Sequence, residues 1–386
     1  MSEVKAQVVV VGAGPAGAMA ARKAAEGGCD TVLLERKSRV GVPVRCGEAV
    51  GLKGVSRTLQ VRPEWVLSTI RSLTMISPSG IRARLANVQE GYVIDRRRMD
   101  ADLVADAVAA GAAYYASTPV VSVREEEYGR YVCEAGNRIF RGRCVILAEG
   151  VESRLARGLG IRTRLDPCDI ETCAFARLEG ATVDPDTVML YFGSDIAPGG
   201  YGWVFPRGDG RANVGVGVLG SRSRAGLALQ MLHRFVETRL GGAAVEELHC
   251  GGVPVGRWLS PLVNRGVMVV GDAARQVSAL TGGGIAYALA AGSLAGESAA
   301  EAFKGGTFRR SALHGYRRRW RWGLGRGQRR SHALKRIVAE YDDAMLDGIA
   351  RDLAAVDSAR LGYVGFALKA FRRRPLHLLR AVALFR

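Results

Sequence analysis

The fold is decided by the stretch VVVVGAGPAG, which runs from Val8 to Gly17. Four β-branched residues in a row suit a strand buried on both faces. Gly12, Gly14 and Gly17 then permit a tight turn, the close approach of a pyrophosphate and the packing of a helix on the strand. A helix that begins here offers free N–H groups and the positive end of its dipole to phosphates. The stretch therefore predicts the first strand–turn–helix of a dinucleotide-binding domain.

The residues that follow strengthen this interpretation. An alanine-rich helix is expected to about Glu26, Gly27-Gly28 would end it, and Thr31–Leu34 reads as a second strand that leads into Glu35. Glu35 lies 18 residues after Gly17, where an acid can accept hydrogen bonds from a ribose. A glycine motif alone is weak evidence, and a purely structural turn is the alternative. The strands, helix and acid together make dinucleotide binding the stronger prediction.

Two later segments distinguish FAD from NAD. Val267–Val270 is a short apolar strand followed by Gly271-Asp272, and a helix is expected from about Ile285. A Gly-Asp after a late strand can hold the ribityl and pyrophosphate groups of FAD. Val145–Gly150 reads as another strand and turn of the same domain. A chain that returns three times to one nucleotide site predicts an FAD domain interrupted in sequence.

Composition excludes several other classes. The 386 residues carry a net charge of +18, and residues 301–386 hold 20 Lys/Arg against 7 Asp/Glu. The apolar fraction of 48% is too high for disorder. Seven scattered cysteines and five scattered histidines predict neither a disulfide framework nor a metal site, and they fit a reducing cytosol. We expect no signal peptide, and residues 276–296 read as a buried glycine-rich loop and helix rather than a membrane span.

Several motifs resemble the geranylgeranyl reductase family, within the flavoproteins related to p-hydroxybenzoate hydroxylase. The resemblance covers about residues 6–300. Its most specific parts are PVRCGE at 43–48, YFG at 191–193, PGGYGWVFP at 198–206 and GDAARQV at 271–277 followed by LTGGGI at 280–285. The last two segments are especially similar to the archaeal branch, which acts on ether lipids. Ala49 and Glu149 depart from the family, which usually has Gly and Asp at these positions.

The resemblance implies a set of cofactor-binding residues. Besides the glycines and Glu35, the positions that match the family's FAD site are Ala16, Arg45, Cys46, Gly47, Arg96, Val120, Asp272, Gly284 and Ile285. Arg98 is the rival of Arg96, because three arginines stand in a row. Arg45 would hold cofactor phosphate or the reduced flavin, and the alternative is a surface guanidinium paired with Glu48.

Cys46 is the candidate catalytic residue. Saturating an isoprenoid C=C bond requires a hydride on one carbon and a proton on the other. The resemblance places Cys46 beside the flavin ring, and a thiol with a reference pKa of ~8.5 is mostly protonated at neutral pH. Cys46 could donate a proton, orient a water, or only pack against the flavin.

Tyr201, Trp203 and Phe205 are the candidate substrate-binding residues. They alternate along a predicted strand within 188–218 and so share one face of an antiparallel sheet. This face suits the wall of an apolar tunnel for prenyl chains. An aromatic stripe is more often ordinary core, but its position inside the family signature favours the tunnel.

The basic C-terminal region suggests a membrane surface. Phe308–Arg330 is rich in Arg with Trp320 and Trp322 interleaved, and Leu361–Arg386 mixes apolar residues with Lys and Arg. Basic amphipathic helices fit an anionic membrane interface. A solvated Arg-rich surface is the alternative, and no nucleic-acid motif is present.

The fold class predicted is α/β, with a Rossmann-like FAD domain, an antiparallel-sheet substrate domain and a basic helical C-terminal region. The expected boundaries are 1–70, 92–165 and 260–300 for the FAD domain, 71–91 and 166–259 for the substrate domain, and 301–386 for the last region. The resemblance implies a reductase of geranylgeranyl chains in 2,3-di-O-geranylgeranylglyceryl phospholipid. The cysteine pattern and the basic C-terminal region predict that it is cytoplasmic and peripherally bound to the membrane.

Other functions stay open at this point. The alternatives are a reductase of geranylgeranyl diphosphate or of a prenylated pigment or quinone, a flavin-dependent aromatic hydroxylase, and a peripheral membrane binder that retains FAD without being an enzyme. The electron donor would be external, and ferredoxin, NADPH and a deazaflavin are the candidates.

Overall fold

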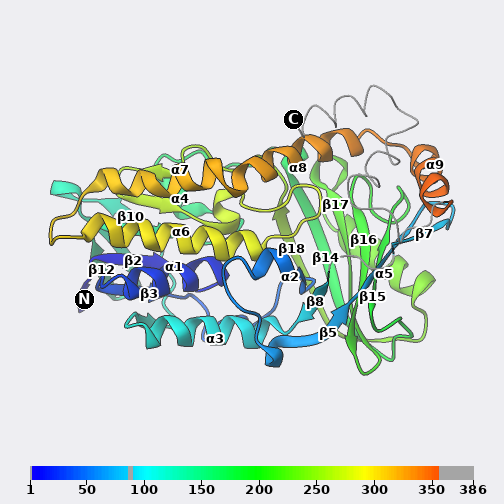
Figure 1. Ribbon diagram of the computed structural model, residues 1–386, viewed down its shortest axis with the longest axis horizontal. Helices are drawn as coiled ribbons and strands as arrows, with labels where there is room; N and C mark the ends of the chain where they lie inside the picture. The colour runs from blue at the N-terminus through cyan, green and yellow to red at the C-terminus, as the bar shows by residue number, and fades with distance from the viewer. Residues whose placement is uncertain (1, 86–89, 356–386) are drawn as a thin grey trace.

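The computed structural model describes residues 2–85 and 90–355. The molecule is elongated, with a mixed helix and sheet body at one end and a large sheet at the other (Figure 1). The basic segment at Leu361–Arg386 lies outside the described residues.

The parallel sheet forms the centre of the first body. Its order is β19-β20-β13-β2-β3-β9, and all neighbours except β19 and β20 run parallel. These strands are β2 (Val8–Val11), β3 (Thr31–Leu34), β9 (Ala113–Tyr115), β13 (Cys144–Leu147), β19 (Val263–Asn264) and β20 (Val267–Val269). Val9 pairs with Val145, which pairs in turn with Val267. Strands from three distant segments therefore build one sheet, as the interrupted domain predicts.

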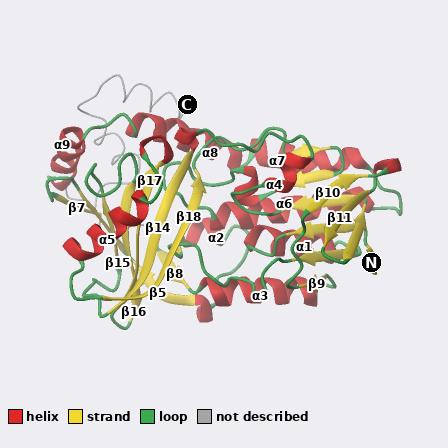
Figure 2. Cartoon of the chain, turned by 180° about the vertical axis from the view of Figure 1, so that it is seen from behind, coloured by secondary structure: helices red, strands yellow, loops and turns green. Residues whose placement is uncertain are grey.

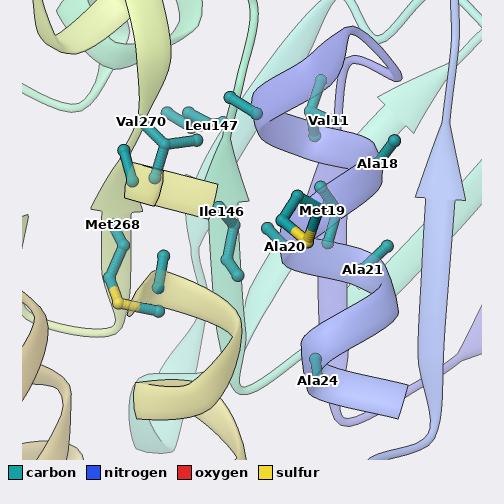
Figure 3. Close-up of a cluster of buried hydrophobic side chains, with 14 of the residues drawn as sticks. Val11, Ala18, Met19, Ala20, Ala21, Ala24, Ile146, Leu147, Met268 and Val270 are labelled. Carbon is teal, nitrogen blue, oxygen red and sulfur yellow. The ribbon is translucent and has the colours of Figure 1, made fainter. Parts of the chain in front are cut away.

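Three helices complete this body: α1 (Pro15–Glu26), α3 (Arg96–Ala109) and α6 (Ile285–Phe303). Helix α1 packs on the strands through small residues and Met19 (Figure 3). Helix α6 lies so close to α1 that a Cβ on Gly292 would stand 2.1 Å from the Ala16 carbonyl oxygen, and one on Gly296 would stand 2.4 Å from that of Ala20. Glycine is therefore required at both positions.

The large sheet forms the second body, with the order β18-β14-β17-β16-β15-β6-β7 (Figure 2). Its strands are β6 (Ser72–Ile76), β7 (Arg82–Leu85), β14 (Ile170–Glu179), β15 (Thr187–Tyr191), β16 (Tyr201–Gly208), β17 (Arg211–Leu219) and β18 (Ala244–Pro254). All pairs are antiparallel except β6 with β15. One face packs on α5 (Leu227–Arg239), and the other carries an aromatic cluster.

Smaller elements surround the two bodies. One small sheet has the order β1-β12-β11-β10 and the other has the order β4-β8-β5. The first comprises β1 (Ser2–Lys5), β10 (Ser122–Glu125), β11 (Tyr131–Ala135) and β12 (Arg138–Gly142). The second comprises β4 (Ala49–Gly51), β5 (Val66–Ile70) and β8 (Gly91–Ile94), with the short helix α2 (Leu52–Val55) directly after β4. Another short helix, α4 (Arg154–Gly158), follows β13 and contacts β10. The predicted α/β class with an interrupted nucleotide domain and an antiparallel sheet is confirmed.

The C-terminal helices lie across both bodies (Figure 1): α7 (His314–Trp322), α8 (Leu324–Val338) and α9 (Asp343–Ala354). On α8, the Ser331 hydroxyl accepts a hydrogen bond from the Leu280 amide at 3.0 Å. On α9, Asp347 accepts one from the Ser77 hydroxyl at 2.6 Å. These helices therefore join the two bodies. No helix among the described residues is long and apolar enough to cross a membrane.

One expectation for this region is wrong. Trp320 was expected on the basic surface with Trp322, but its side chain is fully buried and makes an edge contact with Tyr287 of α6. The two residues lie on different sides of α7, because a two-residue step turns a helix by about 200°. Trp322 is exposed, as expected.

Candidate active site

Two cavities join into one groove between the bodies. The first has a volume of about 600 Å³ and lies beside the carboxyl ends of β2 and β3. The second has a volume of about 670 Å³ and reaches the aromatic face of the large sheet. Both are lined by Gly14, Arg45, Arg96, Ala148 and Gly150. The two cavities therefore adjoin at these residues, one beside the parallel sheet and the other beside the aromatic side chains.

The glycine turn after β2 shapes the first cavity. Gly12 has a φ of +99°, and a Cβ there would stand 2.3 Å from the Ala148 carbonyl oxygen. Gly12 and Gly14 line the cavity. Gly17 lines neither cavity, because it packs against the turn: a Cβ on Gly17 would stand 1.7 Å from the Gly12 carbonyl oxygen. Gly17 thus shapes the site without facing it.

Glu35 and Val120 line the same cavity. The buried Glu35 carboxylate accepts hydrogen bonds from the Ala13 amide at 2.8 Å and the Lys37 amide at 3.0 Å. These two bonds fix the carboxylate at the end of β3 and leave it facing the groove. An acid held in this way can accept hydrogen bonds from a ribose.

Of the two rival arginines, Arg96 is the one that reaches the groove. It lines both cavities, and its guanidinium donates two hydrogen bonds of 2.9 Å to the buried Asp100. Arg98 is exposed. Arg45 is also exposed and lines both cavities, and Glu48 pairs with Arg207 and Arg177 instead of with Arg45.

Ala16, Asp272, Gly284 and Ile285 line the second cavity where α1 and α6 begin. Burial raises the pKa of Asp272 to about 6, although Arg96 opposes the shift. The Asp272 carboxyl makes no hydrogen bond among the described residues. A half-buried carboxyl without a partner at the start of α6 is a position at which a bound hydroxyl group would be stabilised.

Cys46 and Gly47 lie on the opposite wall of the second cavity. The Cys46 sulfur accepts a hydrogen bond from the Glu48 amide at 3.2 Å. Burial raises the pKa of the Cys46 thiol, which the nearby Arg96 partly offsets. The thiol is therefore protonated at neutral pH.

Glu48 anchors this wall to the large sheet. Its buried carboxylate accepts hydrogen bonds from Arg207, from the Asn213 amide group at 2.8 Å and from the Arg96 backbone at 2.9 Å. Asn213 also donates to the Gly47 carbonyl at 3.1 Å. The loop that carries Cys46 is thus held by side chains of β16 and β17.

Tyr201, Trp203 and Phe205 lie together on the cavity wall, as their alternation predicts. Neighbouring ring centroids are 6.1 Å apart in both pairs. The Tyr201 hydroxyl donates to the Thr281 carbonyl at 2.6 Å, and a Cβ on Gly47 would stand 2.9 Å from the Phe205 ring. The aromatic rings and the Cys46 loop therefore pack directly on one another.

Three residues that line the second cavity are not indicated as site residues by any sequence motif. They are Glu171 and Cys173 of β14 and Glu48, for which the sequence suggests only an ion pair with Arg45. Strand alternation places Glu171 and Cys173 on one face, but no motif shows that this face meets the groove. The position of the parallel sheet relative to the large sheet supplies that information.

The comparisons with known proteins agree with this geometry. The family model "Geranylgeranyl reductase catalytic domain" matches residues 169–253, and "Pyridine nucleotide-disulphide oxidoreductase" matches residues 6–174. Digeranylgeranylglycerophospholipid reductase of Methanothrix thermoacetophila is 36% identical, covering 96% of this chain and 97% of the relative. The enzyme of the same name from Methanosarcina acetivorans is 38% identical, covering 92% and 90%.

The chain is also similar to solved structures. A geranylgeranyl bacteriochlorophyll reductase-like protein from Thermoplasma acidophilum has a TM-score of 0.92 at 29% identity, covering 99% of this chain and 100% of the other. A flavin-dependent brominase shares the fold, with a TM-score of 0.71 at 17% identity, covering 97% and 98%. Fold and groove together define a flavoprotein oxidoreductase. Within that class, the chain belongs to the digeranylgeranylglycerophospholipid reductase family.

Proposed function

We propose that the protein is an FAD-dependent reductase that saturates the C=C bonds of geranylgeranyl chains in 2,3-di-O-geranylgeranylglyceryl phospholipid. The observation that carries the proposal is that the two cavities adjoin and share lining residues. One end has the glycine turn and acid of a dinucleotide site, and the other end is lined by Tyr201, Trp203 and Phe205. A prenyl chain that enters along these rings would meet the part of the groove beside Cys46.

The residues of the groove fit FAD. Glu35 would accept from the adenosine ribose and Val120 would lie beside the adenine. Phosphates would lie at the start of α1 near Gly14, where the exposed Arg45 supplies positive charge. The unpartnered carboxyl of Asp272 would accept from the ribityl chain, with Gly284 and Ile285 at the start of α6 beyond it. Each of these groups would then face a part of FAD that matches it chemically.

The reaction needs a hydride, which reduced flavin supplies. This chain's residues hold the alkene and exclude water. The aromatic rings bury the prenyl chain, and Cys46, fixed by the Glu48 amide, contacts the reacting segment and sets its position. Gly47 leaves room for this approach, since any side chain there would collide with Phe205.

A direct assay tests the proposal against its rivals. The purified protein is incubated with chemically reduced FAD and one substrate at a time: the di-geranylgeranyl phospholipid, geranylgeranyl diphosphate, a prenylated quinone, or an aromatic acid with oxygen. The expected result is a mass gain in steps of two hydrogens on the phospholipid. Faster gain on a rival substrate, or oxygen insertion into the aromatic acid, contradicts the proposal.

The proposed site of membrane contact is the α7–α8 basic surface, which comprises Arg317, Arg318, Arg321, Trp322, Arg326, Arg329 and Arg336. All of these residues are exposed. The guanidinium groups of Arg321 and Arg326 lie 5.4 and 4.6 Å from the centre of the Trp322 ring. Exposed tryptophan among cations suits the headgroup region of an anionic membrane.

The proposal also includes the domain boundaries 1–70, 92–165 and 260–300 for FAD, 71–91 and 166–259 for substrate, and 301–386 for the helical region. Sheet membership supports this division, because β6 and β7 pair with the strands of 170–254. The protein would act in the cytoplasm as a peripheral membrane enzyme, with ferredoxin, NADPH or a deazaflavin as external electron donor.

A further inference from the structure

Glu171 is a buried acid on the wall of the second cavity. It lies near the start of β14, and Cys173 and Phe175 follow on the same face of the strand. Its side chain is 7% exposed. Across the sheet, Gly217 leaves space for the carboxyl group, because a Cβ there would stand 3.0 Å from Glu171 Oε2. Because Glu171 also lines the second cavity, its side chain lies on the groove face of the sheet.

The Glu171 carboxyl group has no hydrogen bond or ion pair within residues 2–85 and 90–355. Glu48, the other buried glutamate beside this cavity, has several such partners. The cation that acts most on Glu171 is Lys335 of α8, whose ammonium donates to the carbonyls of Cys168 at 2.6 Å and Val255 at 3.2 Å. A buried acid without a structural partner costs free energy, so it calls for a function.

Its surroundings favour the protonated acid. Burial raises the pKa of Glu171 to about 7, and Lys335 alone opposes the shift. Cys173 and Tyr201 face the carboxyl from β14 and β16, and burial raises the pKa values of both. Glu171 can thus both hold and release a proton near neutral pH, which is what a general acid requires. Asp272 is the other carboxyl of this cavity with a raised pKa, but it lies beside Gly284 at the start of α6, where the ribityl chain would bind.

Two other groups in the cavity are poorer donors. The Tyr201 hydroxyl already donates its proton to the Thr281 carbonyl. The pKa of the Cys46 thiol is raised by burial from a starting value of 9.0, so its proton is held more tightly than that of Glu171. Positioning by Cys46 and protonation by Glu171 are compatible, because both line the same cavity.

We propose that Glu171 is the catalytic acid that protonates the prenyl C=C bond. The inference rests on the proposed function. The O–H bond of Glu171 breaks and its proton bonds to one alkene carbon, using the π electrons. The other carbon, left electron-poor, accepts the hydride, which carries the two electrons of the reduced flavin. The Glu171 carboxylate then recovers a proton from water, and the flavin is left oxidised until the external donor reduces it.

The test compares Glu171→Gln with Glu179→Gln, an exposed glutamate at the other end of the same strand. Flavin-loaded, pre-reduced protein is mixed with di-geranylgeranyl phospholipid, and the first turnover is followed by flavin absorbance. We expect Glu171→Gln to lose about 100-fold or more in rate with unchanged lipid affinity. The wild-type rate should fall as pH rises through about 7, whereas the residual rate of the variant should not.

A second measurement does not depend on turnover. Infrared difference spectra of oxidised, flavin-loaded protein should show two titrating carboxyl groups, Asp272 near pH 6 and Glu171 near pH 7. The band that titrates near pH 7 should shift when the lipid binds and should be missing in Glu171→Gln but present in Asp272→Asn. A Glu171→Gln variant that reacts as fast as wild type, or that keeps the band titrating near pH 7, overturns the inference while the proposed function stands. If wild type and Glu179→Gln both fail to saturate the lipid, the proposed function is wrong and the inference is overturned with it.

Discussion

Arg207 of β16 donates a hydrogen bond to the carboxylate of Glu48, and this pair ties the Cys46 loop to the strand that carries the aromatic rings. Both side chains are almost completely buried: Glu48 is 1% exposed and Arg207 is 9% exposed. Arg177 of β14 lies 3.8 Å from the same carboxylate. The wall of the groove that carries Cys46 is therefore positioned by charges of the large sheet.

Replacing Glu48 by Gln should lower the free energy of unfolding by about 3 kcal/mol, because the buried Arg207 guanidinium would lose its counter-charge. Arg177 would keep its ion pair with Glu247 at 3.0 Å. Urea unfolding of the flavin-loaded protein measures this change. Glu179→Gln, whose ion pair with Arg211 is exposed, should change it by less than about 1 kcal/mol. Equal effects of the two substitutions would contradict the buried-pair interpretation.

The pH dependence of stability should reveal the buried acid at Glu171. Its pKa is raised from 4.5 to about 7 in the folded protein. Between these pH values the folded state holds a proton that the unfolded state has lost, so stability falls as pH rises. Glu171→Gln cannot titrate, so it does not lose stability in this way. The free energy of unfolding of the variant minus that of wild type should therefore rise by about 3 kcal/mol between pH 4 and pH 8. A stability difference that is independent of pH would argue against a raised pKa.

Cys46→Ala and Cys46→Ser test whether Cys46 positions the alkene or only packs against the flavin. If Cys46 sets the position of the alkene, both variants should retain FAD and lose roughly 10- to 100-fold in saturation rate. Flavin absorbance of the purified proteins and product mass spectrometry measure the two properties. Full rate in both variants would mean that Cys46 only packs against the flavin.

The α7–α8 basic surface should bind anionic vesicles. Replacing Arg317, Arg321 and Arg326 by Gln should weaken binding by roughly 100-fold, since each cation near a charged membrane contributes about 1 kcal/mol. The matched control replaces three exposed arginines elsewhere, Arg130, Arg224 and Arg234. Co-sedimentation with phosphatidylserine and phosphatidylcholine vesicles at several salt concentrations measures both triple variants. Equal loss of vesicle binding in the two triple variants would mean that binding depends on net charge alone and not on the α7–α8 basic surface.

The contact between α1 and α6 should tolerate no side chain. Gly292→Ala should cost about 2 kcal/mol or more and weaken FAD binding, because the added Cβ would push α6 away from the Ala16 carbonyl. Gly327→Ala on α8 is the control, since a Cβ there meets nothing within 4 Å. This second change should stabilise the protein by up to about 1 kcal/mol. Thermal unfolding and flavin titration distinguish the two.

Much of the fold was predictable because its signals are local. Four consecutive valines, the glycine turn and Glu35 each follow rules of spacing, and their segments form the expected strands and helix. The alternation of Tyr201 and Trp203 likewise places both on one face.

The unpredicted features depend on contacts between distant segments. Glu48 and Arg207 are 159 positions apart, and no local pattern pairs them. The basic neighbours of Trp320 predict an exposed side chain. The prediction is wrong because Trp320 lies on the face of α7 that packs against α6, where it is buried. Glu171 follows normal strand alternation, and only the meeting of the two bodies turns its face into a cavity wall.

The order of strands in the parallel sheet has a consequence for how the chain folds during synthesis. β2 is made first, yet its neighbour β13 follows more than a hundred residues later, and β20 must still join β13. At ribosomal rates of about 5–20 residues per second, the edge of β2 that pairs with β13 waits for roughly 7 to 27 seconds until β13 is made. During that time its apolar edge is open to mispairing, so recombinant yield should improve when translation is faster or chaperones are abundant.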